Sequence, residues 1–135
     1  FNIGGGMNRD ITFEFPDIDI YAISDNIPFK KEDFSIVELS IEKINQVWKK
    51  DVNTYVGESG NDIKLTKIDA IKKWIKLKAT LYMPILKTYN GDPDCFIIIN
   101  GRHRIAVLRE MGLEYIPFVV PRDQELLFLT RYGKT

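Results

Sequence analysis

The chain has 135 residues, of which 44% are hydrophobic and 28% are charged, so it can form the core of one domain and is not expected to be disordered. Its single Cys excludes an intramolecular disulfide and a multi-Cys zinc site, and its single His excludes a His-rich metal site. The 19 Lys and Arg residues balance the 19 Asp and Glu residues, so any binding of phosphate must come from local placement of charge.

The N-terminal segment has two expected parts. Residues 1–6 are Gly-rich and precede Met7, which is typical of a remnant of cloning, and we expect them to have no function. Residues 7–33 form a lead-in to the domain. Its apolar clusters predict short strands, and Pro16 and a turn signal separate them: Ile11–Phe15, Ile18–Ile23 and the turn Asn26-Ile27-Pro28.

The middle of the chain predicts a strand and two helices. Alternating apolar residues predict a strand over Phe34–Ile41, and helical spacing after Ser40, a candidate N-cap, predicts a short helix to about Asp51. A polar loop follows at residues 57–62. An amphipathic helix is predicted over Ile68–Ala79, with Thr66 as its cap and an apolar stripe of Ile68, Ile71, Trp74, Ile75 and Leu77.

The last third of the chain predicts a hairpin, a helix, a strand and a terminal helix. The strand Met83–Tyr89, the turn Asn90-Gly91-Asp92-Pro93 and a buried central strand at Cys95–Ile99 form the hairpin. The next helix carries Ile105, Leu108 and Met111 on one face and ends at Gly112. We then expect a strand at Tyr115–Val120, placed near a sheet edge by Pro117, and a helix at Glu125–Tyr132 with Pro121 near its start.

The segment from Asn100 to Arg104 carries the chemistry. A buried strand runs into Gly101, which permits a sharp turn, and then directly into a helix whose first turn holds Arg102, His103 and Arg104. The N–H groups of a helix N-terminus favour an anion, whereas cations there are disfavoured by roughly 0.3–1 kcal/mol each. One Arg guanidinium group can donate two parallel hydrogen bonds to phosphate oxygens. The pattern therefore indicates a phosphate site.

A second interpretation of the same turn needs no ligand. The Arg and His side chains would then be solvated, or would pair with nearby carboxylates, of which the sequence offers Asp92, Asp94 and Glu110. Physical chemistry alone leaves both interpretations open.

The run Asn100-Gly101-Arg102-His103-Arg104-Ile105-Ala106, with Leu108, Gly112 and the strand after them, resembles the ParB/sulfiredoxin-like superfamily. The resemblance covers roughly residues 34–131. It implies a compact single α/β domain over residues 34–135, with a small mixed sheet and flanking helices. It also implies that Gly101, His103 and Arg104 cradle phosphates, with Lys67 in the place of a Lys that joins the site in sulfiredoxin.

Departures from the family pattern argue against the sulfinic-acid reduction carried out by sulfiredoxin and weaken the assignment as a simple nuclease. Sulfiredoxin needs a Cys directly after the motif Gly, where this chain has Arg102, and Cys95 lies elsewhere. Partition proteins of the ParB type have Glu at that same place. Many nuclease-like relatives have Asp before the Gly, where Asn100 can donate or accept hydrogen bonds but cannot act as a base.

Other residues have weaker claims to a role. His103 has the side chain that titrates nearest neutral pH and is the default general acid or base. Glu38, on a predicted strand, is a weak candidate for a metal ligand, with surface exposure as the alternative. The Lys-rich face of the Ile68–Ala79 helix is expected to be solvated, and Trp48 and Trp74 are expected to pack in the core, with stacking on a base as the alternative.

Together these points lead to an expected function. We expect the domain to bind a nucleotide, such as ATP or CTP, or a nucleic acid, with Mg²⁺ as a cofactor. Arg102 and Arg104 would stabilise charge while His103 moves a proton, so that phosphodiesters are hydrolysed, as in a toxin-like nuclease module. The alternatives are a nucleotide-binding switch or kinase-like module and an inactive interaction module. The chain shows no signal peptide and no membrane span, so we expect it in a cytoplasm, its own or that of a target cell.

Overall fold

A four-stranded mixed sheet forms the centre of the computed structural model, which describes residues 2–3, 11–16, 22–24, 27–28, 30–57, 65–78 and 80–134. The strand order is β5–β9–β7–β8. β5 is antiparallel to β9, β9 is parallel to β7, and β7 is antiparallel to β8. The strands are β5 (Phe34–Ser40), β7 (Ile85–Tyr89), β8 (Asp92–Asn100) and β9 (Tyr115–Pro121). The expected α/β class with a small mixed sheet is confirmed.

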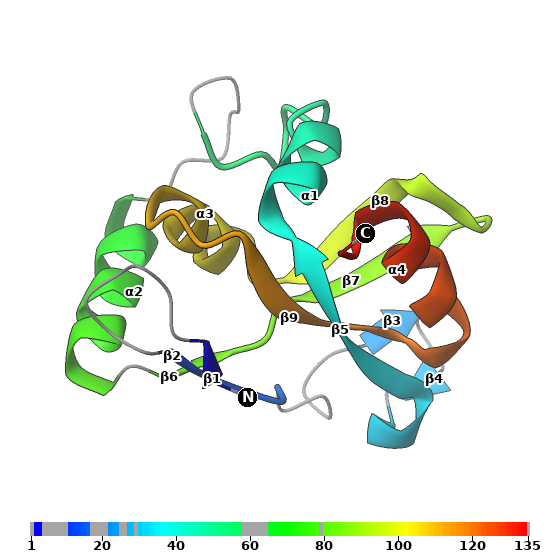
Figure 1. Cartoon of the computed structure of the whole chain (residues 1–135), viewed down its shortest axis with the longest axis horizontal. Coiled ribbons are helices and arrows are strands. Elements are labelled where there is room, and N and C mark those ends of the chain that lie inside the picture. The colour runs from blue at the N-terminus through cyan, green and yellow to red at the C-terminus, as the bar shows by residue number, and fades with distance from the viewer. Residues whose placement is uncertain are drawn as a thin grey trace.

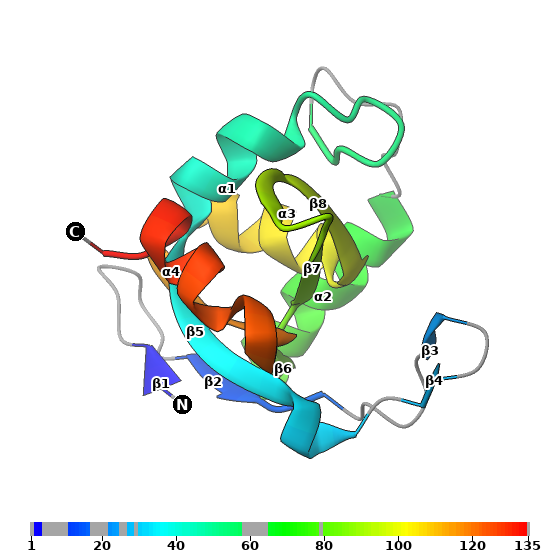
Figure 2. The same cartoon turned by 90° about the vertical axis from the view of Figure 1, so that its right-hand side faces the viewer.

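Four α-helices among the described residues flank this sheet, and Figure 1 shows α2 and α3 at one end of the molecule and α4 at the other. Figure 2 shows α4 lying beside β5, against which it packs. No helix within the described residues is long and apolar enough to cross a membrane. The helices are α1 (Ile41–Trp48), α2 (Leu65–Lys78), α3 (Arg102–Glu110) and α4 (Glu125–Tyr132).

A second, three-stranded sheet joins N-terminal residues to the middle of the chain. β1 (Asn2–Ile3) is antiparallel to β2 (Ile11–Glu14), and β2 is parallel to β6 (Thr80–Tyr82). Ile11 and Phe13 of β2 are buried in the core. The strand expected at Ile11–Phe15 is thus confirmed, and β6 was not predicted.

Several predictions for the N-terminal half concern residues outside the described set. A short hairpin pairs β3 (Ala22–Ser24) with β4 (Ile27–Pro28), so two residues of the expected turn Asn26-Ile27-Pro28 lie in a strand, and Asn26 lies outside the described residues. Most of the predicted strand Ile18–Ile23 lies outside the described residues, as do residues 58–62 of the predicted loop and residues 4–10 near the N-terminus.

The junction between β5 and α1 forms as predicted. The Ser40 side chain accepts a hydrogen bond from the Lys43 N–H at 3.2 Å, which caps the first turn of α1. Ile44 and Trp48 on the inner face of α1 are buried. By contrast, α2 begins at Leu65, so Thr66 lies inside that helix, and the prediction that Thr66 caps it is wrong.

The β7–β8 hairpin is confirmed, but the predicted burial of its second strand is wrong. Asn90 and Gly91 both have positive φ, at 52° and 71°, as a tight two-residue hairpin turn requires. β8 lies at the edge of the sheet, and Ile97 is 36% exposed. An apolar run of this length fits an edge strand as well as a central one, because periodicity does not report which strands lie beside it.

Pro117 lies in β9, an interior strand, so the prediction that it marks an edge is wrong. β9 pairs with β7 only around Val119, whose N–H donates to the Pro84 carbonyl at 2.8 Å. N–H groups two residues apart on a strand point the same way, so position 117 faces the β7 side before β7 begins at Ile85. The missing donor of Pro117 therefore falls where no described strand would accept it.

Side-chain hydrogen bonds attach the C-terminal residues to the hairpin. Gln124 accepts from the Thr88 N–H at 2.9 Å and donates to the Thr88 carbonyl at 3.4 Å, as a neighbouring strand would. The buried Tyr132 hydroxyl donates to the Pro93 carbonyl at 2.6 Å. Helix α4 is confirmed at its predicted bounds, but Pro121 ends β9, and a 3-10 helix, Arg122–Gln124, separates it from α4.

Candidate phosphate site

Gly101 makes the turn between β8 and α3. Its φ of +104° is in the left-handed region, and its carbonyl accepts the first bond of α3, from the Ile105 N–H at 2.9 Å. A Cβ at this position would lie 2.9 Å from the Cβ of Pro84 and 3.0 Å from its Cα. The predicted strand–turn–helix is confirmed, and the close contact that favours glycine here is with Pro84.

The residues predicted to form the site line a single pocket of about 340 Å³. Its walls come from the end of β8, the first turn of α3 and the first half of α2, so segments well separated in the chain meet here. Ala70, Ile71 and Ile99 complete the lining around the predicted residues Lys67, Asn100, Gly101, Arg102, His103 and Arg104.

The charge of this pocket has one sign. Among the described lining residues, Lys67, Arg102 and Arg104 carry positive charge, and none is a carboxylate. Helix α3 also has no acidic residue in its first turn, so its N-terminal dipole adds to the positive potential. The described lining therefore favours an anion over a cation as ligand.

The carboxylates that would have offered an alternative bind other residues. Asp94 accepts a hydrogen bond from Arg131 at 2.8 Å, and Glu110 lies 3.5 Å from Arg109. Asp92 accepts from the Asp94 N–H at 2.9 Å, which stabilises the hairpin turn. The alternative in which these three side chains pair with the Arg102–Arg104 turn is therefore not what the structure shows.

Arg104 is held in place from one side. Its Nη1 donates to the backbone carbonyl of Tyr82 at 2.6 Å, and its Nη2 lies near Gly101. The guanidinium group thus bridges β6 and the turn, with a fixed orientation.

His103 lies in the same turn, and it is buried, with 6% of its surface exposed. It lines the pocket between two arginines, so a proton donor or acceptor is available at the place where the cations gather. Because the His103 side chain is buried, substituting it will also disturb the packing around it.

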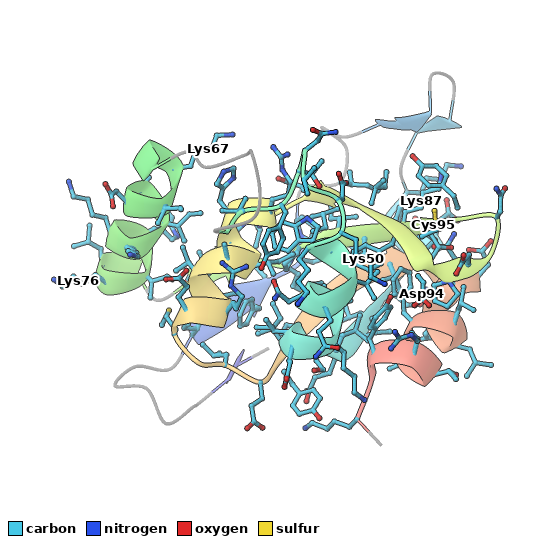
Figure 3. The ribbon with its side chains drawn as sticks, turned by 90° about the horizontal axis from the view of Figure 1, so that it is seen from above. Lys50, Lys67, Lys76, Lys87, Asp94 and Cys95 are labelled. Atoms are coloured by element: carbon cyan, nitrogen blue, oxygen red, sulfur yellow. The ribbon has the colours of Figure 1, made fainter. Side chains whose placement is uncertain are left out.

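Lys67 comes to the pocket from a different element. Figure 3 shows Lys67 projecting from the first turn of α2 on the side of the rest of the molecule, and Lys76 projecting outward from the far end of the helix. Both lysines are exposed. Only Lys67 lines the pocket, which makes Lys76 a matched control of the same charge on the same helix.

Glu38, the weak candidate for a metal ligand, is not brought to this pocket. It lies on β5, where its carboxylate binds the Lys134 ammonium at 2.6 Å, and this hydrogen bond raises the pKa of Lys134. Among the described residues, no three His, Cys, Asp or Glu side chains come together. Because Mg²⁺ prefers carboxylate and phosphate oxygens, this cationic lining does not fit a protein-held Mg²⁺.

A groove of about 280 Å³ next to the pocket was not predicted. Trp74, expected in the core, is 52% exposed and lines this groove, so that expectation is wrong, whereas Trp48 is buried as predicted. The sequence run Lys72-Lys73-Trp74-Ile75-Lys76 holds no local signal for this difference, because Ile75, the next residue, is buried. The lining is Glu14, Ala70, Ile71, Trp74, Thr80, Leu81, Tyr82 and Arg104.

Comparison with protein-family models, with curated proteins and with solved structures gives no match for this chain. The resemblance to the ParB/sulfiredoxin-like superfamily therefore stays a prediction that depends on the motif around Gly101.

Proposed function

We propose that the pocket at the start of α3 binds a phosphate group of a nucleotide or a nucleic acid. The observation that carries the proposal is the convergence of cations from two elements, Lys67 from α2 and Arg102 and Arg104 from α3, on one pocket whose described lining has no carboxylate. A described lining that gathers positive side chains at a helix N-terminus favours an anionic ligand. The resemblance of the motif to phosphate-binding relatives supports the same ligand class.

The roles of the residues follow from their chemistry. Arg102 and Lys67 would neutralise phosphate oxygens, and Arg104, held by the Tyr82 carbonyl, would donate in a fixed direction. Backbone N–H groups of the first turn of α3 would add uncharged donors. Asn100 would hydrogen-bond the ligand. Any Mg²⁺ would be held by the phosphates of the ligand and not by this lining.

Binding tests the proposal directly. Titration calorimetry with inorganic tripolyphosphate and with ATP is expected to show saturable binding that weakens with added salt. Lys67→Gln should weaken binding roughly three- to tenfold, since it removes one exposed charged contact, while Lys76→Gln should leave the affinity unchanged. Absence of binding to both ligands, or an equal effect of the two substitutions, would contradict the proposal.

Hydrolysis is a second candidate function, and the observation that favours it is His103 in the lining of the pocket. In this reaction water attacks phosphorus, the bond to the leaving oxygen breaks, and His103 transfers a proton while the arginines stabilise the charge. Incubation with DNA, RNA and nucleoside triphosphates, with and without Mg²⁺, tests it. A product formed by the wild type and lost in a folded His103→Gln variant supports hydrolysis. Binding without any product favours a nucleotide-binding switch.

A further inference from the structure

The groove lies beside the phosphate pocket and shares part of its wall. Three residues line both: Ala70 and Ile71 on α2, and Arg104 on α3. Arg104 donates to the carbonyl of Tyr82, itself a lining residue of the groove, so its guanidinium group lies at the boundary between the two. A ligand whose phosphate lies in the pocket would extend its next group into the groove.

The walls of the groove are chemically unlike those of the pocket. Trp74 from α2 and Tyr82 from β6 leave about half of their surfaces exposed, at 52% and 50%. Ile71 and Leu81 add aliphatic surface. Large exposed aromatic side chains that gather in a concave site are a common feature of surfaces that bind flat rings.

The groove and the pocket also differ in the charge of their linings. The described lining of the groove contains one carboxylate, Glu14, whereas that of the pocket contains none. An anionic group is therefore favoured in the pocket and a neutral one in the groove. Glu14 can also accept hydrogen bonds from an amino group at the edge of a ring.

We propose that the groove binds the nucleobase of the ligand whose phosphate occupies the pocket, with the base stacked on Trp74. The inference rests on the proposed function and makes it more specific, because it requires a nucleotide with an unpaired base. A volume of about 280 Å³ lies at the small end of ligand pockets and suits one ring system. A base that is paired within a duplex is stacked on its neighbours and would have to leave the helix to reach Trp74.

The test compares ligands with and without a base. ATP and inorganic tripolyphosphate share the triphosphate, so the base and ribose account for the difference in their affinities. Trp74→Leu keeps an apolar side chain but removes the aromatic face. This substitution should weaken the binding of ATP about five- to 150-fold and change the affinity for tripolyphosphate less than twofold. Trp74→Phe keeps a ring and should retain most of the ATP affinity, and Leu77→Ala, on an exposed residue outside the groove, should have no effect.

Tryptophan emission gives a second measurement. Trp48 is buried and Trp74 exposed, so in a Trp48→Phe background the emission reports on Trp74 alone. Stacking predicts that ATP quenches this emission and that tripolyphosphate does not. Circular dichroism and thermal unfolding should show that each variant is folded. The quenching itself needs no substitution at Trp74, so it tests the inference even if Trp74→Leu does not fold.

The outcomes separate this inference from the proposed function. If neither ATP nor tripolyphosphate binds, the proposed function fails. If ATP and tripolyphosphate bind equally and Trp74→Leu changes neither affinity, the phosphate pocket is supported and the base site is wrong. A gain in affinity that depends on Trp74 and occurs with ATP alone identifies a free nucleotide as the ligand. The same gain with a single-stranded oligonucleotide identifies a polymer. Either result supports the base site. A dimer that forms through Trp74 and excludes ATP from it would overturn the inference.

Discussion

Replacing Gly101 by Ala tests how the turn at the phosphate pocket is built. The φ of +104° disfavours any residue with a Cβ, and this conformational strain alone costs roughly 1–2 kcal/mol. The added Cβ would also lie 2.9 Å from the Cβ and 3.0 Å from the Cα of Pro84. Pro84 is buried, and its carbonyl binds the Val119 N–H, so its backbone has little freedom to move away. Overpacking of this kind adds roughly 1–3 kcal/mol.

The two contributions predict that Gly101→Ala lowers the free energy of unfolding by about 2–5 kcal/mol, a large part of the stability of a typical domain. Gly112→Ala is the matched control, because Gly112 also has a positive φ, of +82°, but no atom lies within 4 Å of its added Cβ. It should lose only the conformational part, about 1–2 kcal/mol. Urea unfolding measures both values. A loss for Gly101→Ala within 0.5 kcal/mol of that for Gly112→Ala would refute the close approach of Pro84.

Three further substitutions test contacts away from the pocket, each measured by urea unfolding. Tyr132→Phe should cost about 1–2 kcal/mol at neutral pH. Burial raises the pKa of Tyr132 above its usual value of 10.0, so the wild type should lose stability as pH rises above about 10, by up to ~1.4 kcal/mol per pH unit, and the variant should lack this contribution. Gln124→Ala should cost about 1 kcal/mol and speed amide exchange at Thr88, and unchanged exchange would exclude the bond between them. Ser40→Ala should cost about 1 kcal/mol, because it removes the oxygen that accepts the Lys43 N–H at the start of α1.

The core of the candidate site was predictable because it is local in sequence. Gly101 between an apolar run and a helical repeat predicts the turn, and that turn alone places Arg102, His103 and Arg104 together. Lys67 is more than thirty positions away, and its place at the pocket was expected only from the family resemblance. The structure brings it there because α2 packs against α3.

The wrong predictions share a physical cause. Each depended on which elements lie beside the residue in the fold, and the local sequence does not contain that information. Pro117 and the Cys95–Ile99 run were interpreted by strand rules that depend on which strands lie beside them, and local patterns do not report that order. Trp74 was assigned to the core by its hydrophobicity. Whether a helical residue is covered depends on tertiary packing, and Trp74 lies in the wall of an open groove, where 52% of its surface is exposed.

The pairing of β5 with β9 has a consequence for how the chain folds. It joins Phe34 to Pro121 and Ser40 to Tyr115, partners separated by roughly 80 positions, so closing the sheet requires a large loss of chain entropy. The β7–β8 hairpin and α3, by contrast, come from one short stretch of chain. During synthesis, the hairpin and the turn that contains Gly101 therefore emerge from the ribosome ahead of β9, the strand that completes the sheet.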